Sequence, residues 1–301
     1  MIVSICCQTF NHVHYIEKCL DGFLMQKVNF RFEILLRDDA STDGTAEICQ
    51  TYANKYPDII RLQAYEENQF SKGVIPFQDN VKRAEGKYIA ICEGDDYWTD
   101  PCKLQKQVDF LEANEEYVFC YHRFKTLNQN TGEFKEDENG QYFVSNVSKG
   151  IEFNYEIFYK GWHIGTQTLM FKSDLIKFFS KNNPFFRDVF MIADLLQNGK
   201  GYCLSDFMAV YRKHEGGVYS GIDDLKRAED GMSLYRAIYC AYPQDIFLKL
   251  KYRKFALVYI RHLIHQNNNF KVLKMLFLFL VRDKYFKLFR DAFYLFRKHI
   301  K

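Results

Sequence analysis

Short apolar runs alternate with stretches of helical spacing through the first hundred residues of the chain. The runs occupy residues 2–7, 32–36, 59–64 and 88–92. After the first two runs, apolar side chains recur every three or four residues, as in residues 15–24, which is typical of an amphipathic helix. Another helix is predicted around residues 79–84. Strands that alternate with helices favour a parallel sheet with helices on both faces, so we predict an α/β fold.

The rest of the chain is less regular. We predict strands at 117–124, 168–171 and 202–211, and helices at 173–180 and 189–197. Residues 128–150 are polar and carry no periodic pattern, which favours a surface loop. From about residue 223 onward the pattern is helical almost throughout.

Polar clusters follow three of the predicted strands at the point where each strand ends. They are Thr9-Phe10-Asn11, Asp38-Asp39 and Glu93-Gly94-Asp95-Asp96. Ligands of open α/β sheets bind at the carboxyl ends of the strands, so the three clusters are expected to form one site.

Cysteine usage bears on the compartment. The chain of 301 residues has nine Cys and no Cys-x-x-Cys pair, and several of these Cys lie in apolar runs. This favours reduced, buried thiols. The N-terminal residues lack the basic start of a secretory leader. We therefore expect a cytoplasmic protein, which can also sit peripherally on the inner face of the cytoplasmic membrane.

The net charge of +3 hides a basic C-terminal segment. Residues 271–301 carry nine Lys or Arg against two Asp, and apolar residues from Tyr285 to Phe296 follow a helical stripe. A basic amphipathic helix suits an anionic membrane surface. Packing on the catalytic domain and formation of a homodimer are the alternatives. Nucleic acid is not an expected partner, because no recognised module is present and the remaining residues carry net negative charge.

The adjacent carboxylates Asp95 and Asp96 need an explanation, since like charges at the end of a buried strand repel. Mg²⁺ or Mn²⁺ typically takes one or two carboxylates and completes its shell with water and substrate phosphate oxygens. A bound divalent cation is therefore one explanation of the pair. A solvated turn is the other.

These segments resemble the inverting nucleotide-sugar glycosyltransferases of family 2. Matching motifs occur in the family's order at residues 3–11, 33–45, 80–89, 94–98 and 101–107. The Gly-Asp-Asp-Tyr-Trp motif followed by Pro-x-Lys-Leu-x-x-Gln is a specific match. The resemblance implies a GT-A (Rossmann-like), mostly parallel central sheet flanked by helices. It covers residues 1–220, with a nucleotide-sugar half at about 1–125 and an acceptor half at about 126–220. Residues 221–301 form a helical, basic extension outside it.

The resemblance also implies roles at the strand ends. Thr9, Phe10 and Asn11 would line the nucleotide pocket, and Asp39 would contact the base. Asp95 would reach the ribose or the metal, and Asp96 would be a ligand of Mn²⁺ or Mg²⁺. The family often has a carboxylate directly before the pair, where this chain has Gly94, so the division of roles between Asp95 and Asp96 stays open.

An inverting transfer needs a general base for the acceptor hydroxyl. Asp188 and Asp194 are the candidates, at the start of a predicted apolar helix. Asp188 is favoured because related enzymes place a carboxylate at this spacing before a glycine, here Gly199. An Asp in the first turn that complements the helix dipole is the structural alternative.

Residues beyond 160 complete the expected site. By resemblance, His214 would bind the metal or the diphosphate, and Arg212 would offset the phosphate charge as UDP leaves. Trp162, His163 and Thr166 would shape the acceptor site, although Trp162 can equally be a packing residue.

We therefore predict a metal-dependent glycosyltransferase that uses a nucleotide-sugar, most simply a UDP-sugar. Its acceptor would be a glycan or a lipid-linked glycan of a surface polysaccharide such as a capsule or O-antigen. The alternative is a catalytically degenerate protein of the same fold that binds nucleotide-sugar or acts as a scaffold. A sugar nucleotidyltransferase and a Rossmann dehydrogenase both lack support, because their glycine-rich loops are missing after the first strand.

Overall fold

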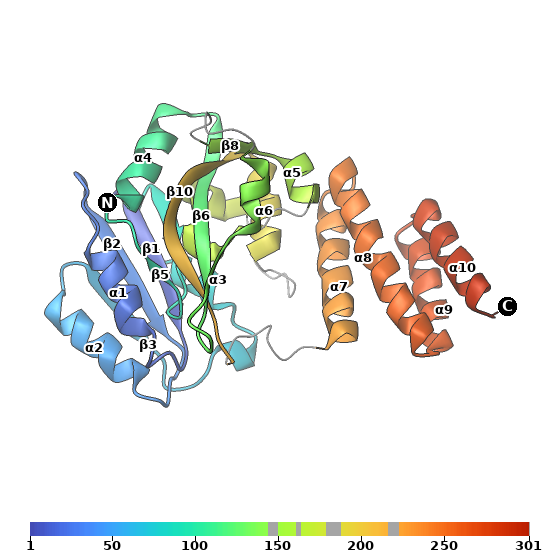
Figure 1. The fold of residues 1–301 in the computed structure, drawn as a ribbon, viewed down its shortest axis with the longest axis horizontal. Helices are drawn as coiled ribbons and strands as arrows, with labels where there is room; N and C mark the ends of the chain where they lie inside the picture. Colours follow the sequence, from blue (N-terminus) through green and yellow to red (C-terminus); the bar gives the residue numbers. More distant parts are fainter. Residues whose placement is uncertain (144–149, 161–163, 179–187, 216–222, 301) are drawn as a thin grey trace. The chain divides into compact units, whose positions relative to one another are not determined.

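The computed structural model describes residues 1–143, 150–160, 164–178, 188–215 and 223–300. The chain divides into two compact units, Met1–His214 and Glu215–Lys301. The first holds a curled sheet with helices, and the second holds helices (Figure 1). The predicted α/β architecture with a helical C-terminal region is confirmed.

The first unit is built on a ten-stranded sheet whose main path has the order β3-β2-β1-β4-β9-β6-β10-β5. The strands predicted in the first hundred residues are present as β1 (Val3–Thr9), β2 (Phe32–Asp38), β3 (Ile60–Ala64) and β4 (Tyr88–Ile91). These four strands pair in parallel. Thr9 lies opposite Asp38, and Cys6 lies opposite Ile91, so the strands end at the same edge of the sheet.

Helices cover both faces of this part of the sheet. α1 (Ile16–Leu24), α2 (Thr45–Lys55) and α4 (Lys103–Ala113) contribute to one apolar core, in which α1 buries Ile16, Leu20 and Phe23. α3 (Pro76–Val81) contacts β1 and β2, and the Asn80 side chain donates to the main-chain carbonyls of Cys7 and Leu35.

The second half of the sheet mixes both strand directions. The long strands β6 (Tyr117–Asn128) and β10 (Lys200–Lys213) run parallel to each other. Antiparallel pairings come from the short strands β5 (Tyr97–Trp98), β7 (Phe134–Glu136), β8 (Gly150–Phe153) and β9 (Met170–Lys172). Strands this short carry little sequence pattern, which is why the sequence did not reveal β5, β7 and β8.

Residues 128–143 are more ordered than the predicted surface loop. β7 pairs with β6, and the 3₁₀ helix η2 (Glu138–Tyr142) follows it. The remaining connections are α5 (Tyr155–Lys160), α6 (Asp188–Leu196) and the 3₁₀ helices η1 (Phe70–Lys72), η3 (Thr166–Thr168) and η4 (Ser173–Phe178). The segment at 173–178, predicted as an α-helix, is therefore a 3₁₀ helix in the structure.

The second unit contains α7 (Asp224–Ala241), α8 (Ile246–His265), α9 (Asn269–Phe277), the π-helical turn η5 (Leu278–Arg282) and α10 (Phe286–Ile300). α8 contacts α7, α9 and α10. The apolar stripe predicted to meet a membrane is largely internal, since Tyr285, Leu288, Ala292 and Phe296 are all buried. Among the described helices, none is long and apolar enough to cross a bilayer.

Candidate functional site

The candidate site lies where β1, β2 and β4 end, and β10 completes it. Asp95 and Asp96 form the turn between β4 and β5. β5 pairs antiparallel with β10, with Tyr97 opposite Val210. This pairing carries Arg212 and His214, which are remote in sequence, to the Asp95–Asp96 turn, as the resemblance implied.

Asp96 is held inside the protein. Its side chain is buried, and Oδ1 accepts a hydrogen bond of 2.8 Å from the main-chain N–H of Arg212. Burial raises the pKa of Asp96 well above its ordinary value, and the negative charges of Asp95 and Glu93 raise it further. A cation close to these carboxylates would offset the unfavourable energy of ionising Asp96 in this environment.

Asp95 faces two histidines. Its Oδ2 lies 3.2 Å from Nε2 of His214 and 3.8 Å from Nε2 of His12. Burial works to raise the pKa of Asp95, but the hydrogen bond from His214 and the charge of His12 outweigh it, and the pKa is lowered. Asp95 is therefore the carboxylate of the pair that stays ionised, next to nitrogen atoms that can also bind a metal. The His214 ring is supported by Tyr15, at a centroid distance of 4.8 Å.

Arg212 supplies fixed positive charge at the same place. Its Nη1 donates to the main-chain carbonyl of Asp95 at 2.5 Å. The guanidinium lies 4.4 Å from the ring centroid of Tyr97 and 5.2 Å from that of Tyr15. These contacts fix its plane, and a planar guanidinium with remaining donors is suited to a phosphate.

Glu93 belongs to the same acidic cluster as Asp95 and Asp96. Its Oε2 accepts a hydrogen bond of 2.6 Å from the hydroxyl of Thr166. Burial raises the pKa of Glu93 to about 7, and the charges of Asp95 and Asp188 contribute to the rise. Thr166, predicted for the acceptor side, thus contacts Glu93, and the charge of Asp188, the predicted base, acts on the same carboxyl. Trp162 and His163 lie outside the described residues.

Asp188 begins α6 and is half-buried. One of its carboxylate oxygens, Oδ1, accepts a hydrogen bond of 2.8 Å from the main-chain N–H of Val189. The rival candidate, Asp194, is buried in the same helix. Of the two residues, Asp188 is the one that is partly exposed to solvent.

The end of β1 carries polar groups, and one of them makes no hydrogen bond among the described residues. Thr9 is buried, and its hydroxyl oxygen has no hydrogen-bond partner among the described residues. A Cβ at Gly94 would lie 2.7 Å from that oxygen, so only glycine fits there. Asn11 adopts a positive φ of 54° and accepts a hydrogen bond from the N–H of Thr42, while the Phe10 side chain is exposed.

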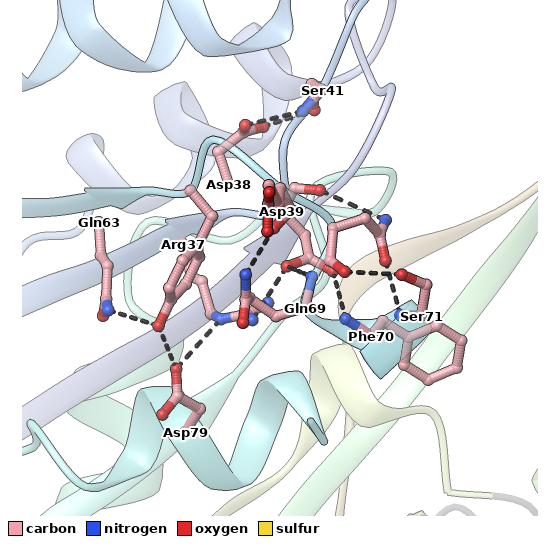
Figure 2. A network of polar contacts seen from close by, with 12 residues as sticks. Arg37, Asp38, Asp39, Ser41, Gln63, Gln69, Phe70, Ser71 and Asp79 are labelled. Atoms are coloured by element: carbon pink, nitrogen blue, oxygen red, sulfur yellow. Dashed lines mark hydrogen bonds and ion pairs between the residues drawn. The ribbon is translucent and has the colours of Figure 1, made fainter. Parts of the chain in front are cut away.

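Asp39 holds a loop in addition to its expected contact with the base. Its two oxygens accept from the main-chain N–H groups of Gln69 and Phe70, each at 3.0 Å, and Oδ1 pairs with Arg37 (Figure 2). Arg37 is fully buried and also lies 3.5 Å from Asp79. Each carboxylate oxygen can accept more than one hydrogen bond, so the contact with the base stays a prediction.

Sequence reasoning missed several residues of this site. His12 and Tyr15 follow the first polar cluster, Tyr97 follows the acidic pair, and Arg37 lies near the end of the buried strand β2. A buried charge at the end of a strand was the available signal for Arg37, because such a charge needs a partner.

The donor set fits a divalent cation held jointly with a substrate. Within the described residues, no group of three or more His, Cys, Asp or Glu side chains is arranged to hold a metal by itself. Asp95 and His214 nonetheless bring a carboxylate and an imidazole within 3.2 Å of each other. Mg²⁺ and Mn²⁺ accept few protein ligands when phosphate oxygens and water supply the others. In this geometry His214 lies against Asp95, and the assignment of Asp96 and His214 as metal ligands stays a prediction.

The chain is similar in sequence to a known enzyme family. The sequence profile described as glycosyl transferase family 2 matches residues 4–182. An uncharacterized protein of Mycobacterium tuberculosis is 43% identical over 127 residues, which are 42% of this chain and 35% of that protein. The putative teichuronic acid biosynthesis glycosyltransferase TuaG of Bacillus subtilis is 34% identical over 110 residues, 36% of this chain and 42% of TuaG. The alignments thus span well under half the length of these relatives.

Two solved structures share the fold. Residues 1–349 of TarS from S. aureus in complex with UDP superpose with a TM-score of 0.57 at 20% identity, covering 91% of this chain and 75% of that one. The mannosyltransferase PcManGT from Pyrobaculum calidifontis, in complex with GDP-Man and Mn²⁺, gives 0.56 at 15% identity, covering 99% and 86%. The sheet and its flanking helices therefore form a GT-A-like fold. The family profile spans more than half of the chain, and the protein belongs to glycosyl transferase family 2.

Proposed function

We propose that this protein is a metal-dependent, inverting glycosyltransferase that moves a sugar from a UDP-sugar to a hydroxyl of a glycan or lipid-linked glycan. The observation that carries the proposal is the meeting of Asp95, Asp96, Arg212 and His214 at the strand ends. It joins carboxylates, an imidazole and a guanidinium, the groups that bind a cation and a diphosphate.

In this proposal the donor lies along the strand ends. The hydroxyl of Thr9 and the main chain near Asn11 line the nucleoside pocket, together with Phe10, and Asp39 accepts from the base. Arg212 faces the diphosphate. Asp95, Asp96 and His214 would hold Mn²⁺ or Mg²⁺, and the ion would neutralise charge on the departing diphosphate. The bound nucleotides of the two structural neighbours support a nucleotide donor.

Asp188 is the proposed general base. Its carboxylate takes the proton of the acceptor hydroxyl as the hydroxyl oxygen bonds to the anomeric carbon. The bond from that carbon to the UDP oxygen breaks on the opposite side, so the configuration inverts. Such a base contributes typically ~10²–10⁴-fold to the rate. The charge of Asp188 contributes to the raised pKa of Glu93, which supports a position close to the acidic cluster.

The acceptor is proposed to be a growing surface polysaccharide. TuaG is named for teichuronic acid biosynthesis, which supports this class. Thr166 lies at the cluster through its bond to Glu93, and Trp162 and His163 precede it in sequence. We propose residues 126–220 as the acceptor half and 1–125 as the donor half.

A donor screen tests the proposal. UDP-, GDP- and dTDP-sugars are incubated with the protein in Mn²⁺ or EDTA, and released nucleotide is measured. We expect Mn²⁺-dependent release from a UDP-sugar, and its loss in Asp188→Asn when an acceptor is supplied. Donor binding without turnover in the wild type, unchanged by Asp188→Asn, would instead favour the degenerate binding protein.

A further inference from the structure

The helix α9 and the turn η5 carry apolar side chains on both sides. Val272, Leu276 and Phe279 are buried against the rest of the helical unit. A surface helix normally turns its apolar side to the core and its polar side to solvent. In α9 and η5 the side that is open to solvent also carries apolar residues.

That open side forms one continuous stripe. Phe270, Leu273, Phe277 and Val281 are 79%, 55%, 66% and 51% exposed. Their spacing of three, four and four residues places them on one face. We call these four residues the α9 face. Scattered exposed apolar residues are ordinary, but a contiguous row marks an interaction surface.

The exposed charged residues around the α9 face are bases. Lys274 is four residues after Phe270 and three before Phe277, so it lies within the face. Lys271, Arg282, Lys284 and Lys287 are exposed close by in sequence.

The acids of this segment do not offset the bases. Asp283 accepts from Nε of Arg236 at 3.0 Å and from the Tyr252 hydroxyl at 2.6 Å. Asp291 accepts from Nε of Arg253 at 2.8 Å. Both acids of residues 271–301 are thus engaged by arginines from α7 and α8, and the exposed bases nearby are left to present net positive charge.

We propose that the α9 face docks on an anionic lipid bilayer, with its aromatic and aliphatic side chains among the acyl chains and its bases on the lipid headgroups. Long basic side chains can reach the headgroups while their stems lie along apolar surface. An apolar stripe edged by Lys and Arg is the chemistry that such an interface selects. The α9 face is distinct from the Tyr285–Phe296 stripe, most of which is buried inside the unit.

Flotation of the full chain with vesicles tests this proposal, and it requires no enzymatic activity. We expect binding to vesicles of phosphatidylcholine with phosphatidylglycerol and little binding to phosphatidylcholine alone. Neutralising two bases in Lys271→Gln/Lys274→Gln should weaken binding by roughly 25-fold, about fivefold for each base. Replacing Phe270→Gln/Phe277→Gln should weaken it by about 100-fold, about tenfold for each ring.

Matched controls separate the α9 face from general surface effects. Phe134→Gln/Ile246→Gln removes two other exposed apolar side chains, and Lys55→Gln/Lys82→Gln removes two other exposed bases. Both controls should bind as the wild type does. Circular dichroism and nucleotide release should be unchanged in every variant, since none of these residues lies at the candidate site.

Three results would overturn the proposal. The first is wild-type protein that fails to float with anionic vesicles. The second is undiminished flotation of the α9 variants. The third is a dimer in sedimentation velocity that the α9 variants dissociate, which would make the face an interface between two copies of the chain.

Discussion

Replacing Glu93 with glutamine should stabilise the metal-free protein, by an amount that grows as the pH rises from 4.5 to about 7. Glu93 is half-buried, and the desolvation of its carboxyl, together with the charges of Asp95 and Asp188, raises its pKa from 4.5 to about 7. This difference corresponds to about 3 kcal/mol, since each tenfold change in proton affinity is ~1.4 kcal/mol. Glutamine keeps an oxygen that can accept from Thr166 but carries no charge.

The direction of this pH effect on stability follows from the protonation of Glu93 in the native and in the unfolded state. Below the unfolded pKa of 4.5 the carboxyl is protonated in both states, and ionisation costs the fold nothing. Between pH 4.5 and the folded pKa of about 7, the unfolded carboxyl ionises while the native one keeps its proton, so stability is lost as the pH rises to about 7 and changes little above it. Glu93→Gln should therefore exceed the wild type by about 3 kcal/mol at about pH 8 and by less than about 1 kcal/mol at about pH 5.

Urea unfolding in EDTA at both pH values measures this difference. The exposed Glu66→Gln is the matched control and should show no pH-dependent gain. A Glu93→Gln variant that gains nothing between about pH 5 and pH 8 would refute the electrostatic account of the cluster. Mn²⁺ with UDP should narrow the gap, because a bound cation offsets the wild-type charge.

Three further substitutions test individual roles. Asp188→Asn should keep donor affinity and lose transfer by at least ~10²-fold in steady-state assays, while a loss in Asp194→Asn alone would move the base there. Arg212→Lys should weaken UDP binding about tenfold or more in calorimetry, since it keeps the charge but loses the planar fork; unchanged affinity would remove the diphosphate role. Thr166→Val should leave the Glu93 carboxylate without its hydroxyl donor and destabilise the fold by ~1–3 kcal/mol in urea unfolding above neutral pH; equal stability would show that the bond is immaterial.

The first part of the fold was predictable because β1, β2 and β4 are almost entirely buried and each holds a run of apolar residues. The helix after β1 buries apolar residues at helical spacing. The short strand β5 has only two residues and no pattern. Its pairing with β10 sets the position of Arg212, so sequence alone could name that residue but not explain how it reaches Asp95.

The sequence allowed us to name residues of the candidate site, but it did not show which of them contact one another. Adjacent acids at a strand end identified Asp95 and Asp96, but their roles depend on which way each carboxylate turns. The fold directs Asp96 to the N–H of Arg212 and Asp95 to His214. The α9 face could not be predicted either, because the helical spacing of apolar residues does not show which side of the helix packs inward.

The central claim is that a divalent cation joins the Asp95–Asp96 turn to the diphosphate of a UDP-sugar. Calorimetry of UDP with the wild type in Mn²⁺ and in EDTA, repeated with Asp95→Asn and Asp96→Ala, tests it most directly. We predict binding by the wild type in Mn²⁺, little in EDTA, and loss of the Mn²⁺-dependent part in both variants. Equal UDP affinity with and without the cation, in wild type and variants alike, would contradict the account.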